Sequence, residues 1–282
     1  METSFEIPFD GGVFAGDSAG LGLPVVFLHS DLTDRRLWQS QMQELAAAGY
    51  HVISYDRRGF GESASEDVPF NHLVDLEAVL DRLSIHAAIL VGVAAGGALA
   101  IDFALEHPER TVGLVLVSTG ITGAPEPELP EEAEQLLDAL AYSEERGQAG
   151  TVANIEAHLW LDGPLSPSGR VDGEERDLFL RMSRDRLAKP RLTQEEERDS
   201  VVENVASITA PVLLVAGELD FPHVLERHED LSEEMENAFA VVLEDTAHLP
   251  NLERPDLFNP LLLEFLEAVS GEGDIGDEEE ED

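Results

Sequence analysis

The run Gly92-Val93-Ala94-Ala95-Gly96 has the spacing of a nucleophile turn but lacks a nucleophile. An apolar segment leads into it, a helix is expected after it, and glycines stand two positions before and two after Ala94. A G-x-S-x-G turn needs small neighbours because its central residue is strained and crowded. The pattern therefore predicts such a turn without its hydroxyl. The alternative is an ordinary glycine-rich turn between a strand and a helix.

Two later residues are able to complete this chemistry. Asp220 follows the apolar run APVLLVAG, and His248 follows AFAVVL, so each stands after a predicted strand. Active sites of open α/β sheets lie at the carboxyl ends of the strands. The order of nucleophile position, acid and histidine along the chain also fits a strand–turn–helix nucleophile. We therefore predict one catalytic site from Ala94, Asp220 and His248. Taken singly, Asp220 fits a helix cap and His248 a loop histidine.

An oxyanion hole is the other component that such a site requires. One donor is the backbone N–H of the residue after the nucleophile position, which is Ala95, and the second comes from a loop after an early strand. The loop of residues 29–34, HSDLTD, occupies that place, and the main chain of Asp31 is the predicted donor. A negative charge on Asp31 opposes an oxyanion unless its side chain turns away.

The elements that must position these residues alternate between two patterns. Continuous β-branched runs predict buried parallel strands, and a 3.6-residue apolar period predicts helices between them. Together they predict an α/β fold with a mostly parallel sheet flanked by helices. Residues 5–9 and 12–14 are expected to add antiparallel edge strands. The strands are predicted at residues 24–30, 51–55, 87–93, 112–118, 210–216 and 238–243, and the helices at 34–48, 73–83, 96–106 and 256–269.

The alternation stops over residues 121–207, which are acidic, rich in arginine and without a strong strand pattern. We expect this insertion between two strands to be an all-helical lid over one end of the sheet. The α/β core is then made of residues 1–120 and 208–270. Residues 271–282, GEGDIGDEEEED, are predicted to be a disordered acidic tail.

The charge of the chain is its most unusual bulk property. Fifty-nine acidic residues face 17 basic ones, for a formal net charge of −42, and Lys189 is the single lysine. Such self-repulsion strains a compact state at low salt, whereas molar salt shortens the Debye length to about 3 Å. Charge spread along the whole chain favours a high-salt cytoplasm, as in extreme halophiles, over a cation- or histone-binding acidic protein. It also argues against nucleic-acid binding, which needs a basic patch.

Other partners and compartments are limited by what the sequence lacks. There are no cysteines, and the nine histidines have no metal-ligand spacing, so neither a metal nor a cofactor is predicted. The N-terminal residues lack the pattern of a signal peptide, and no apolar run reaches the ~18 residues that span a bilayer. We expect a cytoplasmic protein that does not contact membranes and binds a small molecule.

Several stretches of the sequence together resemble one known protein family. The chain resembles α/β-hydrolase-fold proteins over nearly its whole length, and its HSDLTDRRLW segment is similar to the 3-oxoadipate enol-lactonase branch. Ser30 and Asp31 depart from that branch, where a glycine usually follows the histidine. The resemblance implies an ester or lactone ligand, with Ser30 and the lid residue Trp160 as candidate substrate-binding residues; a packed lid tryptophan is the alternative. The matching stretches are YDRRGFGES, the turn around Ala94, EHPERTVGLVLV, APVLLVAGELD, LWLDGP and AHLPNLERPDLFNPLLLEFL.

Ala94 leaves three interpretations of the function open. The chain is an ester or lactone hydrolase carrying Ser→Ala at position 94, or a natural pseudoenzyme that binds a small ligand under its lid. In the third, His248 with Asp220 acts as a general base without a covalent intermediate, as in a lyase, isomerase or oxygenase. Alanine cannot be acylated, and neither Ser30 nor Ser118 stands in a comparable turn.

Overall fold

The computed structural model describes residues 3–271, and the predicted tail from residue 272 onward lies outside the described residues. Its sheet runs in the order β1-β2-β4-β3-β6-β7-β8-β9, and the short β5 pairs with β2. The strands are β1 (Thr3–Phe9), β2 (Gly12–Ala19), β3 (Pro24–Leu28), β4 (His51–Tyr55), β5 (Ala64–Ser65), β6 (Ala88–Val93), β7 (Thr111–Val117), β8 (Val212–Gly217) and β9 (Ala238–Leu243).

The sheet is parallel from β4 to β9, and β1 and β2 form the antiparallel edge. The central strands β3, β6, β7 and β8 are almost entirely buried, as their continuous apolar runs predict. The edge strands were predicted from Phe5 to Phe9 and from Gly12 to Phe14, and β2 extends five residues further because it also pairs with β4.

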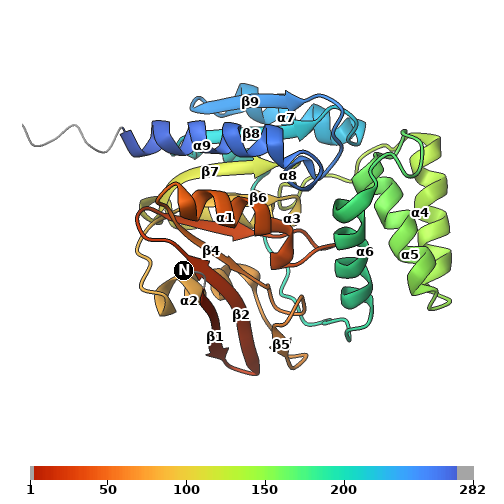
Figure 1. Ribbon diagram of the computed structural model, residues 1–282, viewed down its shortest axis with the longest axis horizontal. Coiled ribbons are helices and arrows are strands. Elements are labelled where there is room, and N and C mark those ends of the chain that lie inside the picture. Colours follow the sequence, from red (N-terminus) through yellow and green to blue (C-terminus); the bar gives the residue numbers. More distant parts are fainter. Residues whose placement is uncertain (1–2, 272–282) are drawn as a thin grey trace, which may run out of the picture.

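Helices cover both faces of the sheet (Figure 1). Apolar residues of α1 and α9 pack on one face, and those of α2, α3 and α7 pack on the other. The helices of this core are α1 (Gln39–Ala47), α2 (His72–Arg82), α3 (Ala95–Glu106), α7 (Pro222–Glu234), α8 (Pro250–Glu253) and α9 (Pro255–Gly271), with short 3₁₀ turns η1 (Arg35–Trp38), η2 (Pro108–Arg110) and η4 (Val202–Ser207). The helix predicted at 34–48 is thus a 3₁₀ turn followed by a shorter α-helix.

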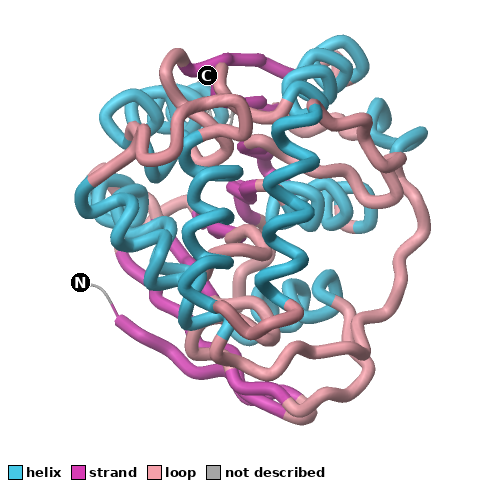
Figure 2. The backbone as a smooth tube through the Cα atoms, turned by 90° about the vertical axis from the view of Figure 1, so that its right-hand side faces the viewer, coloured by secondary structure: helices cyan, strands magenta, loops and turns pink. Residues whose placement is uncertain are grey.

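The segment between β7 and β8 forms a separate group of helices at the carboxyl ends of the parallel strands (Figure 1). Seen from that end, helices stand in front of the strands (Figure 2). They are α4 (Glu131–Glu144), α5 (Ala149–Glu156), the π-helical turn η3 (Ala157–Asp162) and α6 (Gly173–Leu187). The expectation of an all-helical segment is wrong for residues 121–130 and for residues 188–201, which run without a helix. We call residues 188–201 the strap.

The strap is tied to the core at several points. Glu195 forms a parallel bridge with Phe70, and Thr193 bonds Asp67 through both its N–H and its hydroxyl at 2.8 Å. The single lysine, Lys189, donates to the main-chain oxygens of residues 60 and 63 at 3.2 and 3.1 Å. Polar groups of the strap form hydrogen bonds with carbonyls and carboxylates of the core in place of helical hydrogen bonds. This explains why the helical prediction fails here.

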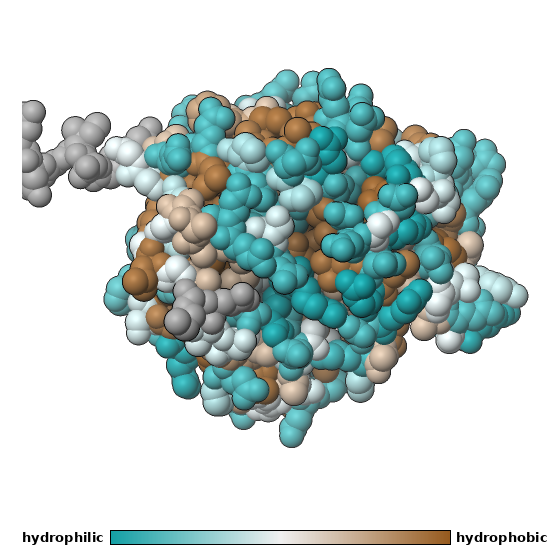
Figure 3. Space-filling view, in the orientation of Figure 1, coloured by the Kyte–Doolittle hydropathy of each residue, from teal (hydrophilic) through white to brown (hydrophobic). Residues whose placement is uncertain are grey.

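One face of the molecule is mostly hydrophilic. Hydrophilic side chains cover most of the face shown in Figure 3, and hydrophobic ones occur in scattered patches. Among residues 3–271, no helix is both long and apolar enough to cross a membrane.

Candidate active site

Ala94 occupies a strained turn between β6 and α3. Its backbone has φ 50° and ψ −114°, a conformation that L-residues adopt only when the surroundings force it. Its N–H donates to the Val117 carbonyl at 3.0 Å, and its own carbonyl accepts from Ala98 and Gly120. A Cβ on Gly92 would overlap the main chain of Gly96. The turn therefore has the backbone of a nucleophile elbow, as the glycine spacing predicts.

The histidine and the acid are in direct contact. The Nδ1 atom of His248 lies 2.9 Å from both carboxylate oxygens of Asp220, and both side chains are buried. Asp220 follows β8 and His248 follows β9, so the sheet places both at the edge where β6 delivers Ala94. With Nδ1 donating to the carboxylate, Nε2 is the ring atom left to act as a base.

The His248 loop is held by a residue that the sequence analysis did not assign. The buried carboxylate of Glu253 accepts the N–H of Ala247 at 3.0 Å and that of Leu249 at 3.3 Å, one on each side of His248. Burial raises the pKa of Glu253, and the ion pair with Arg170 opposes this shift. Glu253 lies within AHLPNLERP, one of the stretches that carry the family resemblance, but the sequence alone gave this residue no role.

Arg170 joins this loop to the helical segment. It pairs with Glu253 and donates to the carbonyl of Asp245 at 2.7 Å and to those of Leu161 and Asp162, both at 2.7 Å. One arginine therefore satisfies the end of the π-helical turn η3 and the loop that carries His248. Its contacts thus link this part of the insertion to the loop that carries His248.

The predicted oxyanion loop is organised around His29. Its Nδ1–H donates to the Ser30 carbonyl at 2.7 Å, and its Nε2 accepts the N–H of Arg57 at 2.9 Å. Complete burial, followed by the charge of Arg57, lowers the pKa of His29 to about 3. The ring is therefore neutral at ordinary pH. One hydrogen bond holds the ring within the loop after β3, and the other ties this loop to the turn after β4.

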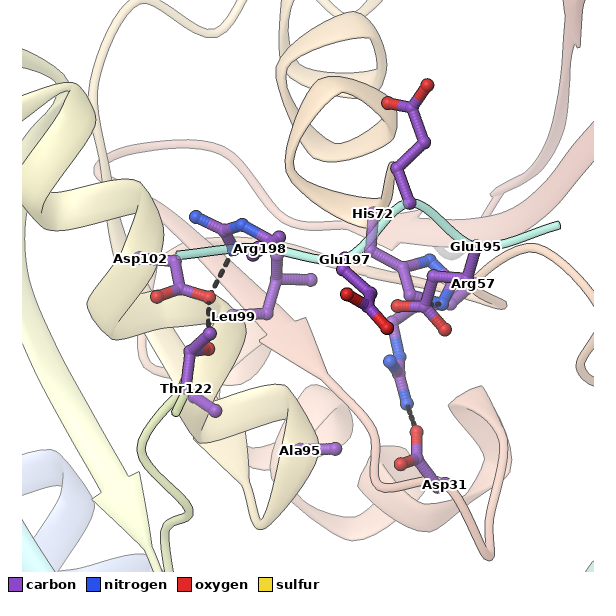
Figure 4. Close-up of a pocket in the computed structure, with 12 residues that line it drawn as sticks. Asp31, Arg57, His72, Ala95, Leu99, Asp102, Thr122, Glu195, Glu197 and Arg198 are labelled. Atoms are coloured by element: carbon purple, nitrogen blue, oxygen red, sulfur yellow. Dashed lines mark hydrogen bonds and ion pairs between the residues drawn. The ribbon is translucent and has the colours of Figure 1, made fainter. Parts of the chain in front are cut away.

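The charge of Asp31 is compensated within the same loop pair. Its side chain turns towards Arg57, with 2.5 Å between the carboxylate and the guanidinium (Figure 4). Although burial alone raises the pKa of Asp31, Arg57 holds it below its ordinary value, so the group stays ionised. Arg57 lies within YDRRGFGES, one of the stretches that carry the family resemblance, and the sequence alone gave it no role.

Two cavities adjoin the predicted oxyanion loop. The first, of about 370 Å³, is lined by Asp31, Arg57, His72 and Ala95 among others, and we call it the oxyanion pocket (Figure 4). The second, of about 730 Å³, lies against the helical segment and is called the lid pocket. Asp31, His72 and Glu195 of the strap line both cavities. The two predicted backbone donors, Asp31 and Ala95, thus share one cavity.

The two predicted substrate-binding residues lie in different environments. Trp160 lines the lid pocket and packs against Phe221, with 6.1 Å between ring centroids. Ser30 is buried, and its hydroxyl lies 3.0 Å from that of Thr33. Ser30 lines neither of the two pockets, and neither do Ala94, Asp220 and His248.

Ser118 is the one further hydroxyl near the strand ends that the sequence singled out. It follows β7, between the strands that lead to Ala94 and Asp220, and its φ of 43° is also positive. Its Oγ is buried and has no hydrogen-bond partner among residues 3–271. A buried hydroxyl does not meet a substrate, so Ser118 does not replace the missing nucleophile. Within the described part of the chain, no group of three or more His, Asp or Glu side chains has an arrangement suited to a metal ion.

These features define the class of the protein: a scaffold for hydrolysis with a nucleophile elbow, an acid–histidine pair and an oxyanion loop. Residues 25–261 match the model of the alpha/beta hydrolase family, and the chain belongs to this family. The expected fold and family are thereby confirmed.

Individual relatives span almost the whole chain. It is similar to a 2-hydroxy-6-oxo-6-phenylhexa-2,4-dienoate hydrolase of Burkholderia cepacia, at 30% identity over 89% of this chain and 90% of the relative. It is also similar to 3-oxoadipate enol-lactonase 1 of Acinetobacter baylyi, at 25% identity over 87% and 89%. The fold matches a thermophilic esterase from Thermogutta terrifontis with a TM-score of 0.76 and 24% identity, covering 95% of this chain and 99% of that one.

Proposed function

We propose that this chain binds a small ester- or lactone-type molecule at the oxyanion pocket and is nearly inactive as a serine hydrolase because Ala94 cannot be acylated. The observation that carries the proposal is the backbone of Ala94, which keeps the φ and ψ of a nucleophile turn beside an intact acid–histidine pair. Removing the serine of a triad costs on the order of a million-fold in turnover and leaves binding and oxyanion stabilisation.

Two further features support a ligand of this class. Asp31 and Ala95 line one cavity, and we propose that their N–H groups hold a carbonyl oxygen of the ligand there. The relatives include a lactonase, and a fold neighbour is described as an esterase. We propose that the lid pocket, with Trp160, receives the larger part of the ligand. The origin of the alanine, by substitution or by descent, is decided by codon 94 of the source gene.

Ala94→Ser is the direct test. Hydrolysis of short-chain p-nitrophenyl esters in molar KCl should rise by at least about 10⁴-fold over the present chain, because only the serine variant forms an acyl-enzyme. A matched double variant, Ala94→Ser with His248→Ala, should lose that gain. A serine variant as inert as the present chain, yet folded by circular dichroism, would show that the site is not a latent serine hydrolase.

A second candidate function rests on the intact pair itself. With Nδ1 of His248 held by Asp220, Nε2 remains available to take a proton from a substrate or from water without a covalent intermediate. The assay is the activity of the present chain before and after His248→Ala. An activity of the Ala94 chain that disappears in this variant supports general-base chemistry, and persistence of the activity excludes it.

A further inference from the structure

Strand β9 leaves one edge of the sheet open. It pairs only with β8 among the strands of residues 3–271, and Figure 1 shows it at the outer edge of the sheet. None of the residues of β9 is buried, whereas all residues of β8 are buried. Phe239 is 69% exposed and Val242 is 47% exposed. An open edge with exposed apolar side chains is a template on which another strand can pair.

The other edge of the sheet is protected against such pairing. Strand β1 carries Glu6, whose charge hinders the approach of a second strand, and Pro8, which has no N–H to donate. Strand β9 has the sequence AFAVVL, with neither a charge nor a proline. Because the chain has a formal net charge of −42, an uncharged sheet edge is a surface where two copies approach with little repulsion.

The backbone groups that β9 directs outward follow from its hydrogen bonds to β8. The carbonyls of Asn237 and Leu243 accept N–H groups from β8 and from the residue after it, both at 3.0 Å. The odd-numbered residues of β9 therefore direct their backbone groups towards β8. Since the direction alternates along a strand, Ala240 and Val242 direct their N–H and C=O groups away from the sheet. The open edge thus offers two donors and two acceptors.

We propose that β9 is the contact between two copies of this chain, paired antiparallel about a two-fold axis that is perpendicular to the sheet and passes through Val241. In this register Ala240 of each copy lies opposite Val242 of the other, so the outward N–H and C=O groups of both residues are bonded. Phe239 of one copy lies opposite Leu243 of the other on the same face, which covers its exposed ring.

The neighbouring register satisfies fewer of these groups. The two-fold axis keeps the faces of the sheet together, so it can shift only from one residue to the next. Centred on Ala240, it places Val242 opposite Ala238 of the other copy. The N–H of Ala238 already donates to the carbonyl of Met235 at 3.1 Å, and it is not free for a second strand. The register centred on Val241 is therefore preferred.

The charges beside β9 are compatible with this pairing. The first acidic residues before and after the strand are Glu236 and Glu244. Glu244 of one copy comes closest to Ala238 of the other, so no carboxylate lies directly opposite another. The remaining repulsion between two acidic copies is screened in molar salt, where the Debye length is about 3 Å. We expect the pair to form at high salt and to weaken as the salt is lowered.

A lysine on the open edge tests the contact. Sedimentation equilibrium of the present chain in molar KCl, from about 1 μM to 1 mM protein, should show the mass rising from one chain to two. Val242→Lys should weaken this association at least about tenfold, because a lysine on a strand edge opposes pairing. The matched control is Val74→Lys, since Val74 on α2 is 58% exposed and lies outside the contact. It should change the association by less than about twofold.

Single cysteines test the register. The chain has no cysteine, so an introduced one can form a disulfide only with the same residue of another copy. Val241 faces itself in a non-hydrogen-bonded pair, where Cα atoms lie about 4.5 Å apart, a separation that a disulfide spans. Under mild oxidation in molar KCl, Val241→Cys should therefore become a linked dimer. Ala240→Cys should stay unlinked, because its two copies lie more than about 7 Å apart in this register.

Three results would overturn the proposal. The first is a present chain that stays monomeric up to millimolar concentration in molar KCl. The second is a dimer that survives Val242→Lys in a chain folded by circular dichroism, or that Val74→Lys weakens equally. The third is disulfide formation in Ala240→Cys that equals or exceeds that in Val241→Cys. If Val242→Lys does not fold, the two cysteine variants decide. All of these measurements are independent of the hydrolysis that Ala94→Ser gains or does not gain.

Discussion

The two halves of the site differ in how closely they match a complete serine hydrolase site. One half contains the acid and the histidine, and the other contains the nucleophile position and the oxyanion loop. In the first, the Asp220–His248 pair is complete, and Glu253 and Arg170 hold the loop around it. In the second, the backbone of the elbow is kept, but Ala94 has no hydroxyl and Asp31 adds a carboxylate to the oxyanion loop. The departures are thus confined to side chains on one side of the site.

The φ and ψ of Ala94 indicate that the backbone of an elbow forms here with no hydroxyl on its central residue. The strain at Ala94 is imposed by the glycines and by hydrogen bonds to the strand and helix around it. The oxyanion loop tolerates Asp31 because Arg57, from the turn after β4, neutralises it. Each half is therefore maintained by its own neighbours, and each can be perturbed separately.

The largest effect is expected at neutral His29, which ties the oxyanion half together. Its pKa in the folded protein is about 3, against an ordinary value of 6.5. The unfolded chain binds a proton below pH 6.5, whereas the folded protein does not until near pH 3. The stability that the neutral ring provides is full above pH 6.5 and is lost as the pH falls towards 3. The free energy of unfolding should therefore fall by about 1.4 kcal/mol per pH unit from this residue.

Urea unfolding of the present chain and of His29→Gln at several values between pH 7 and 4.5, in the same KCl, measures this term. The glutamine variant is less stable at pH 7 but should lose less on acidification, so the two curves approach each other. His72→Gln is a matched comparison, because His72 also has a pKa well below its ordinary value. Parallel curves for the present chain and His29→Gln contradict a neutral His29 in the folded protein.

Much of this arrangement could be predicted from the sequence. Buried parallel strands and the glycine spacing around Ala94 are local patterns. The sheet, the elbow and the order of Asp220 and His248 along the chain could therefore be predicted. The partners of Arg57 and Glu253 could not be predicted. Their ion pairs and hydrogen bonds join residues that have no regular spacing along the chain for a sequence pattern to reveal. The strap was missed for a related reason: its conformation is set by bonds to Phe70 and Asp67 rather than by a period of its own.

An intermediate effect is expected at Glu253, in the acid–histidine half. In the Ala94→Ser background, Glu253→Gln should lower kcat by about tenfold with little change in KM. The amide group places either an NH2 beside Arg170, where Oε2 forms an ion pair, or an NH2 beside the two N–H groups that Oε1 accepts, so one set of contacts is lost. Glu218→Gln is the matched control: this exposed glutamate accepts the N–H of Asp245 in the same loop at 3.3 Å. Equal losses of kcat in the two variants would show that the hydrogen bonds accepted by Glu253 beside His248 have no special role.

The smallest effect tests whether the elbow is strained without its nucleophile. The φ of 50° and ψ of −114° at Ala94 mirror the extended region, which glycine enters without a Cβ clash. Relief of the strain is worth 1–3 kcal/mol and is partly offset by the flexibility of glycine when unfolded, so Ala94→Gly should raise the free energy of unfolding by about 1 kcal/mol. Ala95→Gly, one residue later in α3, should lower it by up to about 1 kcal/mol, since no strain is relieved there. Changes of opposite sign in the free energy of unfolding, measured with urea, locate the strain at Ala94. A lower free energy of unfolding in both variants means that the turn is relaxed and that the missing hydroxyl has changed the backbone too.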